Sequence, residues 1–402
     1  MMVTKFLNQK NYKLNLFLLF SLIGISIRVW ISQFGSNFDF TMWQINLDLF
    51  KEGKSIYEFG NYTYSTPWIY TLYFLDTISL SNFDNISFIK NIPGTSYRFK
   101  IIVFLSLIDI YIFYLLYKNY SLKIGLLFIL NPISIILTGH HNAFDNYAIL
   151  FGLLGVLMYG ELNEKITLKK LISIFLFGLS LSIKHILFFF PLWWAFKEKK
   201  LVNKLLVLII PYFIFLITFT PFLPEDFQNI IYKIFYFGKS ETGPFWKIIL
   251  PEIFDRYLSF HTLFSFLMII LGFCFVNKDL KKSFYLYLIA VIAFAPAMYT
   301  QYLFIPLIAM VIYCNLKTAI FTIITSLLFL VDSDQLNIQY LREIFDWNLR
   351  YTRIVFYPLT LILLIEFFEK ATNLRKINST FFNLFNIFLK NVKNSFFFKN
   401  IK

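Results

Sequence analysis

The sequence is a succession of long apolar runs separated by short polar segments, and this pattern constrains the fold most strongly. A transmembrane α-helix needs about 20 mostly apolar residues. Runs near that length are 14–33, 98–117, 122–138, 144–160, 168–184, 203–221, 260–276, 283–298, 300–314, 317–331 and 354–368. A shorter run, 185–197, carries Pro191 and is expected to form a kinked or partial span. With 58% hydrophobic and 15% charged residues, the chain has more apolar surface than a soluble domain can cover. We therefore expect an all-α polytopic membrane protein.

The positions of the basic residues predict how these helices cross the membrane. Lys and Arg are enriched in cytoplasmic loops. If both termini are cytoplasmic and the run 67–80 lies on the outer surface, 23 of the 37 Lys and Arg residues fall on the cytoplasmic side. If 67–80 crossed the membrane, the basic clusters 197–200 and 277–282 would lie outside. The sequence therefore predicts about 12 transmembrane helices in a single domain over 1–402, with both termini cytoplasmic.

This arrangement leaves three sizeable segments on the outer face, 34–97, 222–259 and 332–353. The first is a long extracytoplasmic loop with apolar residues at the spacing of an interfacial helix, namely Met42, Ile45, Leu49 and Phe50. The basic tail 371–402 is suited to a cytoplasmic surface helix on anionic lipid. The net charge of +14 does not indicate nucleic-acid binding, because the cations form short clusters between apolar runs.

Three charged residues are not explained by the packing of apolar helices. Asp39 follows the first run by a few residues, where an acidic group can act as a general base on a hydroxyl, although it can also be a solvated loop carboxylate. Arg28 lies inside the first run and needs a partner there, either a lipid phosphate or a loop carboxylate. Lys184 ends the fifth run on the outer side, against the positive-inside trend, and a buried Lys near helix termini suits a phosphate.

The turn at 138–146, TGHHNAFDN, concentrates polar residues between two apolar runs. Its adjacent histidines, His140 and His141, cannot both bind one metal from a helix, and no HExxH motif is present. We expect this turn either to hydrogen-bond a sugar or diphosphate, or to satisfy the polar groups at the helix ends. The chain also lacks the glycine-rich motifs that hold nucleotides. The sequence thus predicts no metal site and no cofactor, and leaves dependence on a divalent metal open.

Several short motifs resemble those of GT-C glycosyltransferases, and they occur in the same order. The first-loop pattern is F-D-F at 38–40, then Gly53-x-x-x-Tyr57 and Tyr62-x-Tyr64-x-x-Pro67. It resembles the first loop of the GPI mannosyltransferase catalytic subunit and of bacterial lipid-dependent mannosyltransferases. The other motifs resemble segments of the same class, including the dolichol-pathway glucosyltransferases: Tyr97-Arg98, Asn131-Pro132 with His141-Asn142-Ala143, Ser182-Ile183-Lys184 with Pro191, 234–237 with Phe245-Trp246, and Thr300-Gln301-Tyr302 with Pro306.

The resemblance implies a GT-C-like fold and an inverting hexosyltransferase, mannosyl or glucosyl. The sugar would come from a polyprenyl- or dolichyl-phosphate donor and pass to a glycan or lipid acceptor on the extracytoplasmic face. Asp39 would be the catalytic base, because Asn37 stands at the first acidic position of the family motif. The leaving phosphate would be held by cations drawn from Arg28, Lys184, Arg98 and Lys239. The sugar or phosphate would contact His140, His141 and Gln301.

Two other functions share some of these features. A transporter or flippase for a polyprenyl-linked glycan would also need membrane-embedded cations, but such sites usually lie near the midplane between repeats, and the sequence has no internal repeat. A polymerase or ligase of surface polysaccharide would use the same lipid-linked donor. The expected location is a bacterial inner membrane in preference to the eukaryotic endoplasmic reticulum.

Overall fold

Helices are the only regular structure in the part of the chain that the structure describes. The computed structural model describes residues 2–60, 62–79, 92, 94–235, 260–296, 299–331, 336–345 and 352–367. No strand occurs among these residues. The prediction of an all-α protein is therefore confirmed for them.

The first helices in chain order are α1 (Met2–Ile31), η1 (Ser32–Phe34), α2 (Phe38–Lys51), α3 (Pro67–Thr77), α5 (Thr95–Asn119), α6 (Leu122–Ile129), α7 (Pro132–Ile136), η2 (Leu137–His141) and α8 (Asp145–Tyr159). The next are α9 (Leu168–Ile183), η3 (His185–Leu187), α10 (Phe190–Lys197), α11 (Leu201–Ile217) and α12 (Leu223–Phe235). The last are α14 (Phe260–Cys274), α15 (Leu280–Ala293), η5 (Thr300–Phe304), α16 (Leu307–Tyr313), α17 (Leu316–Val331), α18 (Gln339–Phe345) and α19 (Thr352–Phe367). η2 is a short π-helix, and the other η elements are 3₁₀ turns.

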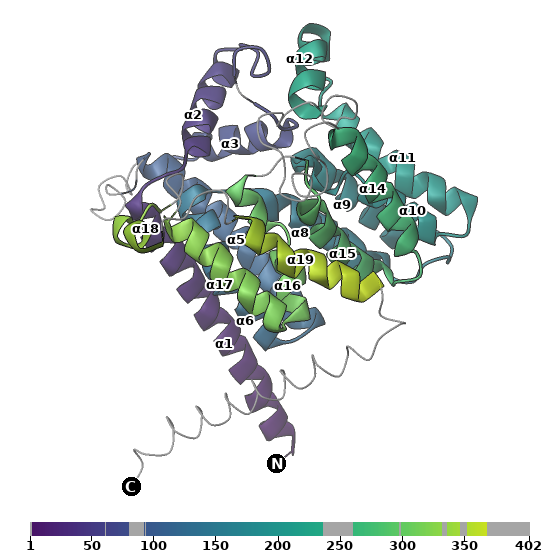
Figure 1. The fold of residues 1–402 in the computed structure, drawn as a ribbon, viewed down its shortest axis with the longest axis horizontal. Coiled ribbons are helices and arrows are strands. Elements are labelled where there is room, and N and C mark those ends of the chain that lie inside the picture. Colours follow the sequence, from purple (N-terminus) through teal and green to yellow (C-terminus); the bar gives the residue numbers. More distant parts are fainter. Residues whose placement is uncertain are drawn as a thin grey trace.

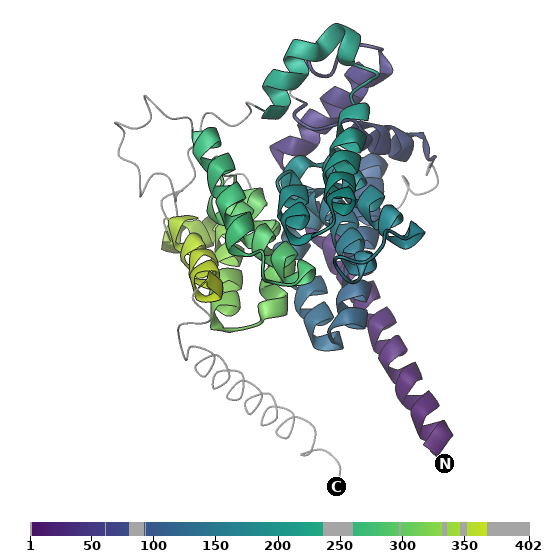
Figure 2. The same cartoon turned by 90° about the vertical axis from the view of Figure 1, so that its right-hand side faces the viewer.

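The helices form two groups that pack side by side. Helices α14 to α19 lie on one side, and α1 with α5 to α11 lies on the other (Figure 2). The groups meet where α10 packs against α14 and α15, and where η2 contacts η5. The N-terminal part of α1 projects from one end of the molecule, whereas α2, α3 and α12 gather at the opposite end (Figure 1). The described helices of the first two predicted outer loops, including α2 with Asp39, are therefore at one end (Figure 1).

Two described helical segments are long and apolar enough to cross a membrane, Leu14–Phe34 and Ser96–Asn119. The pair Leu122–Ile129 and Pro132–His141 passes the same test together, with a bend of 45° between the two helices. Shorter apolar helices of 10–17 residues occupy several other predicted spans, for example Asp145–Tyr159 and Leu316–Val331. These features are compatible with a helical membrane protein, and the number of about 12 spans stays a prediction.

The bent pair differs from the continuous helix that was expected over 122–138. Proline has no N–H and disfavours a helical residue before it, so α6 ends at Ile129 and a new helix starts at Pro132. The Asn131 side chain caps that helix by accepting a hydrogen bond from the Ile133 N–H at 3.0 Å. The chain then continues as the π-helix η2, which is followed by Asn142 in the left-handed region with φ 64°. The two histidines therefore lie at the end of a bent helical segment, whose break is set by Pro132 and by the Asn131 cap.

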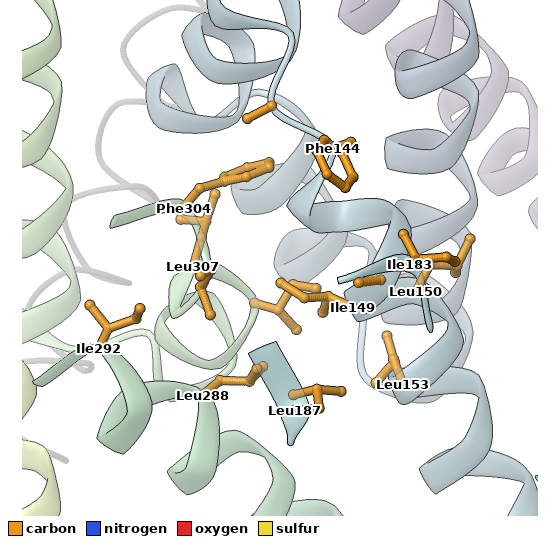
Figure 3. Packing of buried hydrophobic residues seen from close by; sticks show 14 of the residues in the cluster. Phe144, Ile149, Leu150, Leu153, Ile183, Leu187, Leu288, Ile292, Phe304 and Leu307 are labelled. Atoms are coloured by element: carbon orange, nitrogen blue, oxygen red, sulfur yellow. The ribbon is translucent and has the colours of Figure 1, made fainter. Parts of the chain in front are cut away.

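The core beneath this end is a contiguous cluster of buried apolar side chains from both helix groups. Ile149 of α8, Leu187 of η3, Leu288 of α15 and Leu307 of α16 approach one another there (Figure 3). All four side chains are fully buried. Burial of one such side chain is worth about 1.5–3 kcal/mol in an aqueous reference. This packing fixes the positions of α8, η3 and η5, which carry polar residues at their ends.

The predicted loops also contain helices. α2 forms in the first loop and buries Phe40, Trp43 and Leu47 against the protein. The face predicted to lie on the membrane surface leaves Ile45 exposed, and its contact with a membrane stays a prediction. α12 forms within 222–259, and the rest of that loop, 236–259, lies outside the described residues, as does the basic tail 371–402.

Candidate functional site

Asp39 lies in the first turn of α2, where the local sequence favours a carboxylate. Asn37 caps the helix, and its Oδ1 accepts a hydrogen bond from the Asp39 N–H at 2.6 Å. A negative charge in the first turn interacts favourably with the helix dipole. The Asp39 side chain is 27% exposed, so its carboxylate can reach a ligand.

Two polar side chains from distant segments contact the Asp39 carboxylate. His141 Nε2 at the end of η2 lies 2.9 Å from Asp39 Oδ2, a distance typical of a charge-assisted hydrogen bond. Gln301 Nε2 in η5 donates to the same oxygen at 3.5 Å. The structure thus brings together three of the residues selected from the sequence, one from each of α2, η2 and η5.

The surroundings of Asp39 favour its ionised form. Burial raises the pKa of this carboxyl. The hydrogen bond with His141, the charge of His141 and the charge of Lys184 lower the pKa, and together they outweigh the effect of burial. The net result is a pKa below the ordinary value for Asp. Asp39 is therefore a carboxylate at neutral pH and can accept a proton.

Lys184 lies beyond the end of α9 in an extended conformation and points its ammonium group into a polar and aromatic environment. Its Nζ donates to Asp145 Oδ1 at 2.8 Å. The same nitrogen lies 5.2 Å from the centre of the Tyr64 ring, 5.0 Å from that of Phe144 and 5.5 Å from that of Tyr302. Cation–π attraction and the ion pair together offset the cost of burying this charge.

A cavity of about 330 Å³ opens beside Lys184. Its walls are mostly apolar and aromatic, and they include Phe189 of the segment after η3, Phe264 of α14 and Ile292 of α15. Tyr64 and Tyr302 also line it, and both interact electrostatically with Asp39. The cavity therefore has a cation in its wall, and two of its tyrosines lie within electrostatic reach of Asp39, which is not itself a lining residue.

Two further polar residues belong to this region: Asp145, which is part of the polar turn 138–146, and His185, which was not selected from the sequence. Asp145 Oδ2 and His185 Nδ1 are buried and have no hydrogen-bond partner among the described residues. His185 lines the cavity next to Lys184. The available sequence signal was their position at the ends of apolar runs, because Asp145 opens one run and His185 follows another.

Arg98 has a different environment from the one expected of a phosphate ligand. It is fully buried. Its Nε donates to Asn142 Oδ1 at 2.8 Å, its Nη1 to Ser32 O at 2.9 Å and its Nη2 to His140 O at 2.7 Å. All of its guanidinium nitrogens are thus used by the protein. Arg98 holds the end of η2 against η1, close to Asp39.

The remaining residues selected from the sequence do not contact Asp39. Arg28 is fully buried and forms an ion pair with Asp109, with Nε and Oδ2 3.0 Å apart. Its partner is thus a carboxylate within the helix α5 and not the loop carboxylate that was one of the two alternatives, and Arg28 does not line the cavity. The ring of His140 faces Gly35, where an added Cβ would lie 3.2 Å from His140 Nε2. Lys239 lies outside the described residues.

The described residues contain no cluster of three or more His, Cys, Asp or Glu side chains suited to a metal ion. No protein-family model, curated protein or solved structure matches this chain.

Proposed function

We propose that this protein is an inverting glycosyltransferase of the membrane that takes its sugar from a polyprenyl-phosphate donor. The observation that carries the proposal is an ionised, partly exposed Asp39 within electrostatic reach of Lys184, which lies in the wall of a largely apolar cavity. A base and a site for an anionic amphiphile are the two elements that such a transfer requires.

The reaction is a single displacement at the anomeric carbon. Asp39 accepts the proton of an acceptor hydroxyl as that oxygen forms a bond to the carbon. The bond between the anomeric carbon and the phosphate oxygen breaks, and its electron pair leaves with the lipid phosphate. The configuration inverts because attack and departure take place on opposite faces. Asp39 then releases its proton to water, which restores the carboxylate.

His141 and Gln301 act on the base and not on the lipid in this proposal. Both donate to Asp39 Oδ2, which leaves Oδ1 for the incoming hydroxyl. A fixed carboxylate orientation matters because the efficiency of proton transfer depends on geometry within hydrogen-bond reach. The predicted sugar or phosphate contact of His141 thereby becomes a contact to the base.

Lys184 and His185 provide the site for the donor phosphate. An ammonium group has three N–H donors, and Lys184 makes a hydrogen bond to Asp145. Its other donors are available to phosphate oxygens in the cavity. The apolar walls suit the first part of a polyprenyl chain, and the volume lies at the lower end of the range for small-molecule sites.

The arrangement of the helices supports a site at a membrane surface. Asp39 follows the candidate span Leu14–Phe34 by a few residues, and His141 ends the bent pair. We infer a multi-pass protein with about 12 spans, both termini in the cytoplasm and the site on the outer face of a bacterial inner membrane. The acceptor is a lipid-linked or surface glycan.

The experiment is transfer by the purified protein from a panel of polyprenyl-phosphate mannose and glucose donors. The expected result is release of lipid phosphate together with a product of inverted anomeric configuration, determined by NMR. Retention of configuration, or no release from any donor in the presence of glycan and lipid acceptors, would contradict the proposal. Uptake of the intact donor into vesicles without cleavage would favour a flippase instead.

A further inference from the structure

Arg28 and Asp109 form an ion pair within the apolar spans, and the proposed chemistry does not use it. Arg28 lies in the candidate span Leu14–Phe34 and Asp109 in Ser96–Asn119. Both side chains are 0% exposed, with Arg28 Nε 3.0 Å from Asp109 Oδ2. Burying two charges costs several kcal/mol each, and an apolar pair is often at least as stable. Simple stabilisation therefore does not account for this pair.

The ion pair is bonded to the chain on both sides of the break between α6 and α7. Arg28 Nη1 donates to Ile129 O, the last residue of α6, at 3.0 Å. Arg28 Nη2 donates to Ser134 Oγ in α7 at 2.6 Å. Pro132 has no N–H to continue the helical hydrogen bonds of α6, and the contacts to this one guanidinium group join the two helices across the bend.

Asp109 extends the same network to η2 and α8. Its Oδ2 accepts a hydrogen bond from Thr138 Oγ1 in η2 at 2.7 Å, and its Oδ1 accepts one from Asn146 Nδ2 in α8. The backbone of η2 also packs closely against α1, because a Cβ added at Gly139 would lie 2.5 Å from Arg28 O. Thus η2 and α8 each donate a side-chain hydrogen bond to the Asp109 carboxylate.

The network reaches the histidine that contacts Asp39 within one turn of η2. Thr138, which donates to Asp109, precedes His141 by three residues, and its carbonyl accepts a hydrogen bond from Asn142 Nδ2 at 3.0 Å. We propose that Arg28 and Asp109 are positioning residues that hold η2 so that His141 stays bonded to Asp39. This role depends only on the contact between His141 and Asp39. If Asp39 is the base, as in the proposed function, the same contact fixes the orientation of its carboxylate.

The consequence is measurable at Asp39 without any substrate. The titratable groups that face Asp39 are His141 from η2, Lys184 after α9, Tyr64 from the first loop and Tyr302 from η5. If η2 shifts, only the His141 contact is lost directly. Loss of an opposite charge within hydrogen-bond reach raises a carboxyl pKa by about one unit or more. At a pH above the titration midpoint, a rise of one unit in the pKa makes the protonated fraction of the carboxyl tenfold larger.

The experiment is carbodiimide labelling of Asp39, quantified by peptide mass spectrometry as a function of pH, because the reagent requires the protonated carboxyl. The full chain is used in detergent. Thr138→Val removes the hydroxyl that reaches Asp109 with little change of shape, and Asp109→Asn removes the charge. His141→Gln removes the contact itself. Thr325→Val is the matched control, because Thr325 is also buried and its hydroxyl has no partner among the described residues.

The expected result is a labelling rate at fixed mildly acidic pH that rises about tenfold in Thr138→Val, Asp109→Asn and His141→Gln, with the titration midpoint moved up. Thr325→Val and the rescue variant Thr138→Ser should match the wild type. Wild-type midpoints in both Thr138→Val and Asp109→Asn would overturn the proposal, and so would a wild-type midpoint in His141→Gln. If Asp109→Asn does not fold, Thr138→Val decides. Labelling does not depend on turnover, so failure of the proposed function would be seen separately.

Discussion

The imidazole of His141 lies 2.9 Å from the carboxylate of Asp39, although 102 residues separate them in the sequence. The carboxylate stands in the first turn of a loop helix, and the imidazole ends a broken span. Between them they join the polar end of α2 to the interior of the helix bundle.

The first prediction concerns the pH dependence of stability. The pKa of Asp39 is lower in the folded protein than its ordinary value. The ionised Asp39 therefore stabilises the fold above its unfolded-state pKa, and this contribution is lost as the pH falls through the folded pKa. The difference in melting temperature between the wild type and Asp39→Asn should be largest near neutral pH and shrink on acidification. Thermal unfolding in detergent at several pH values measures it, and a difference that grows on acidification would contradict the assignment.

The second prediction concerns the ion pair of Lys184 and Asp145. Lys184→Met leaves a buried carboxylate without its partner, and breaking a buried pair costs about 3–5 kcal/mol. The double variant Lys184→Met/Asp145→Asn removes both charges and should recover most of that stability. Melting temperatures measure this recovery.

Binding of the donor separates the two roles of Lys184. Both Lys184 variants should lose affinity for a polyprenyl phosphate, because the cation in the cavity wall is absent in each. Lys54→Met, at a lysine whose side chain is 58% exposed, is the control and should bind as the wild type does. A double variant that binds the lipid phosphate with wild-type affinity would remove Lys184 from the donor site.

The third prediction concerns the orientation in the membrane. In a background with Cys274→Ser and Cys314→Ser, the variant Lys54→Cys should react with an impermeant thiol reagent from the extracytoplasmic side. Lys200→Cys, between α10 and α11, should react only from the cytoplasmic side. The reason is the excess of Lys and Arg on the cytoplasmic side of the proposed topology. Labelling of both positions from the same side would exclude that topology.

Part of this site could be predicted from the sequence, because polar residues at the ends of apolar runs stand out. Asp39 and His141 were selected in that way, whereas Gln301 was selected from the motif Thr300-Gln301-Tyr302, and the structure brings the three side chains together. The cavity could not be predicted, because its walls come from residues of common apolar types on several helices. His185 was overlooked for a related reason, since a single polar residue next to Lys184 gives no separate pattern.

The partners of the buried arginines were beyond the reach of sequence patterns. Arg28 pairs with Asp109, which lies 81 residues away in another span, and no local spacing connects the two. Arg98 donates mainly to backbone carbonyls, and these are present at every residue. The break at Asn131 and Pro132 carried a clear signal, yet the π-helix that follows it depends on these distant contacts.

The most direct test of the account is sugar transfer by purified Asp39→Asn compared with the wild type and Asp48→Asn. The Asn side chain keeps the shape of Asp39 but cannot accept the proton, so turnover should fall about 10²–10⁴-fold. Binding of the donor should persist, because its phosphate contacts lie at Lys184. Asp48 is exposed on the same helix, and its variant should retain turnover. A wild type that transfers sugar and an Asp39→Asn protein that transfers it at a similar rate would contradict the central claim that Asp39 is the base.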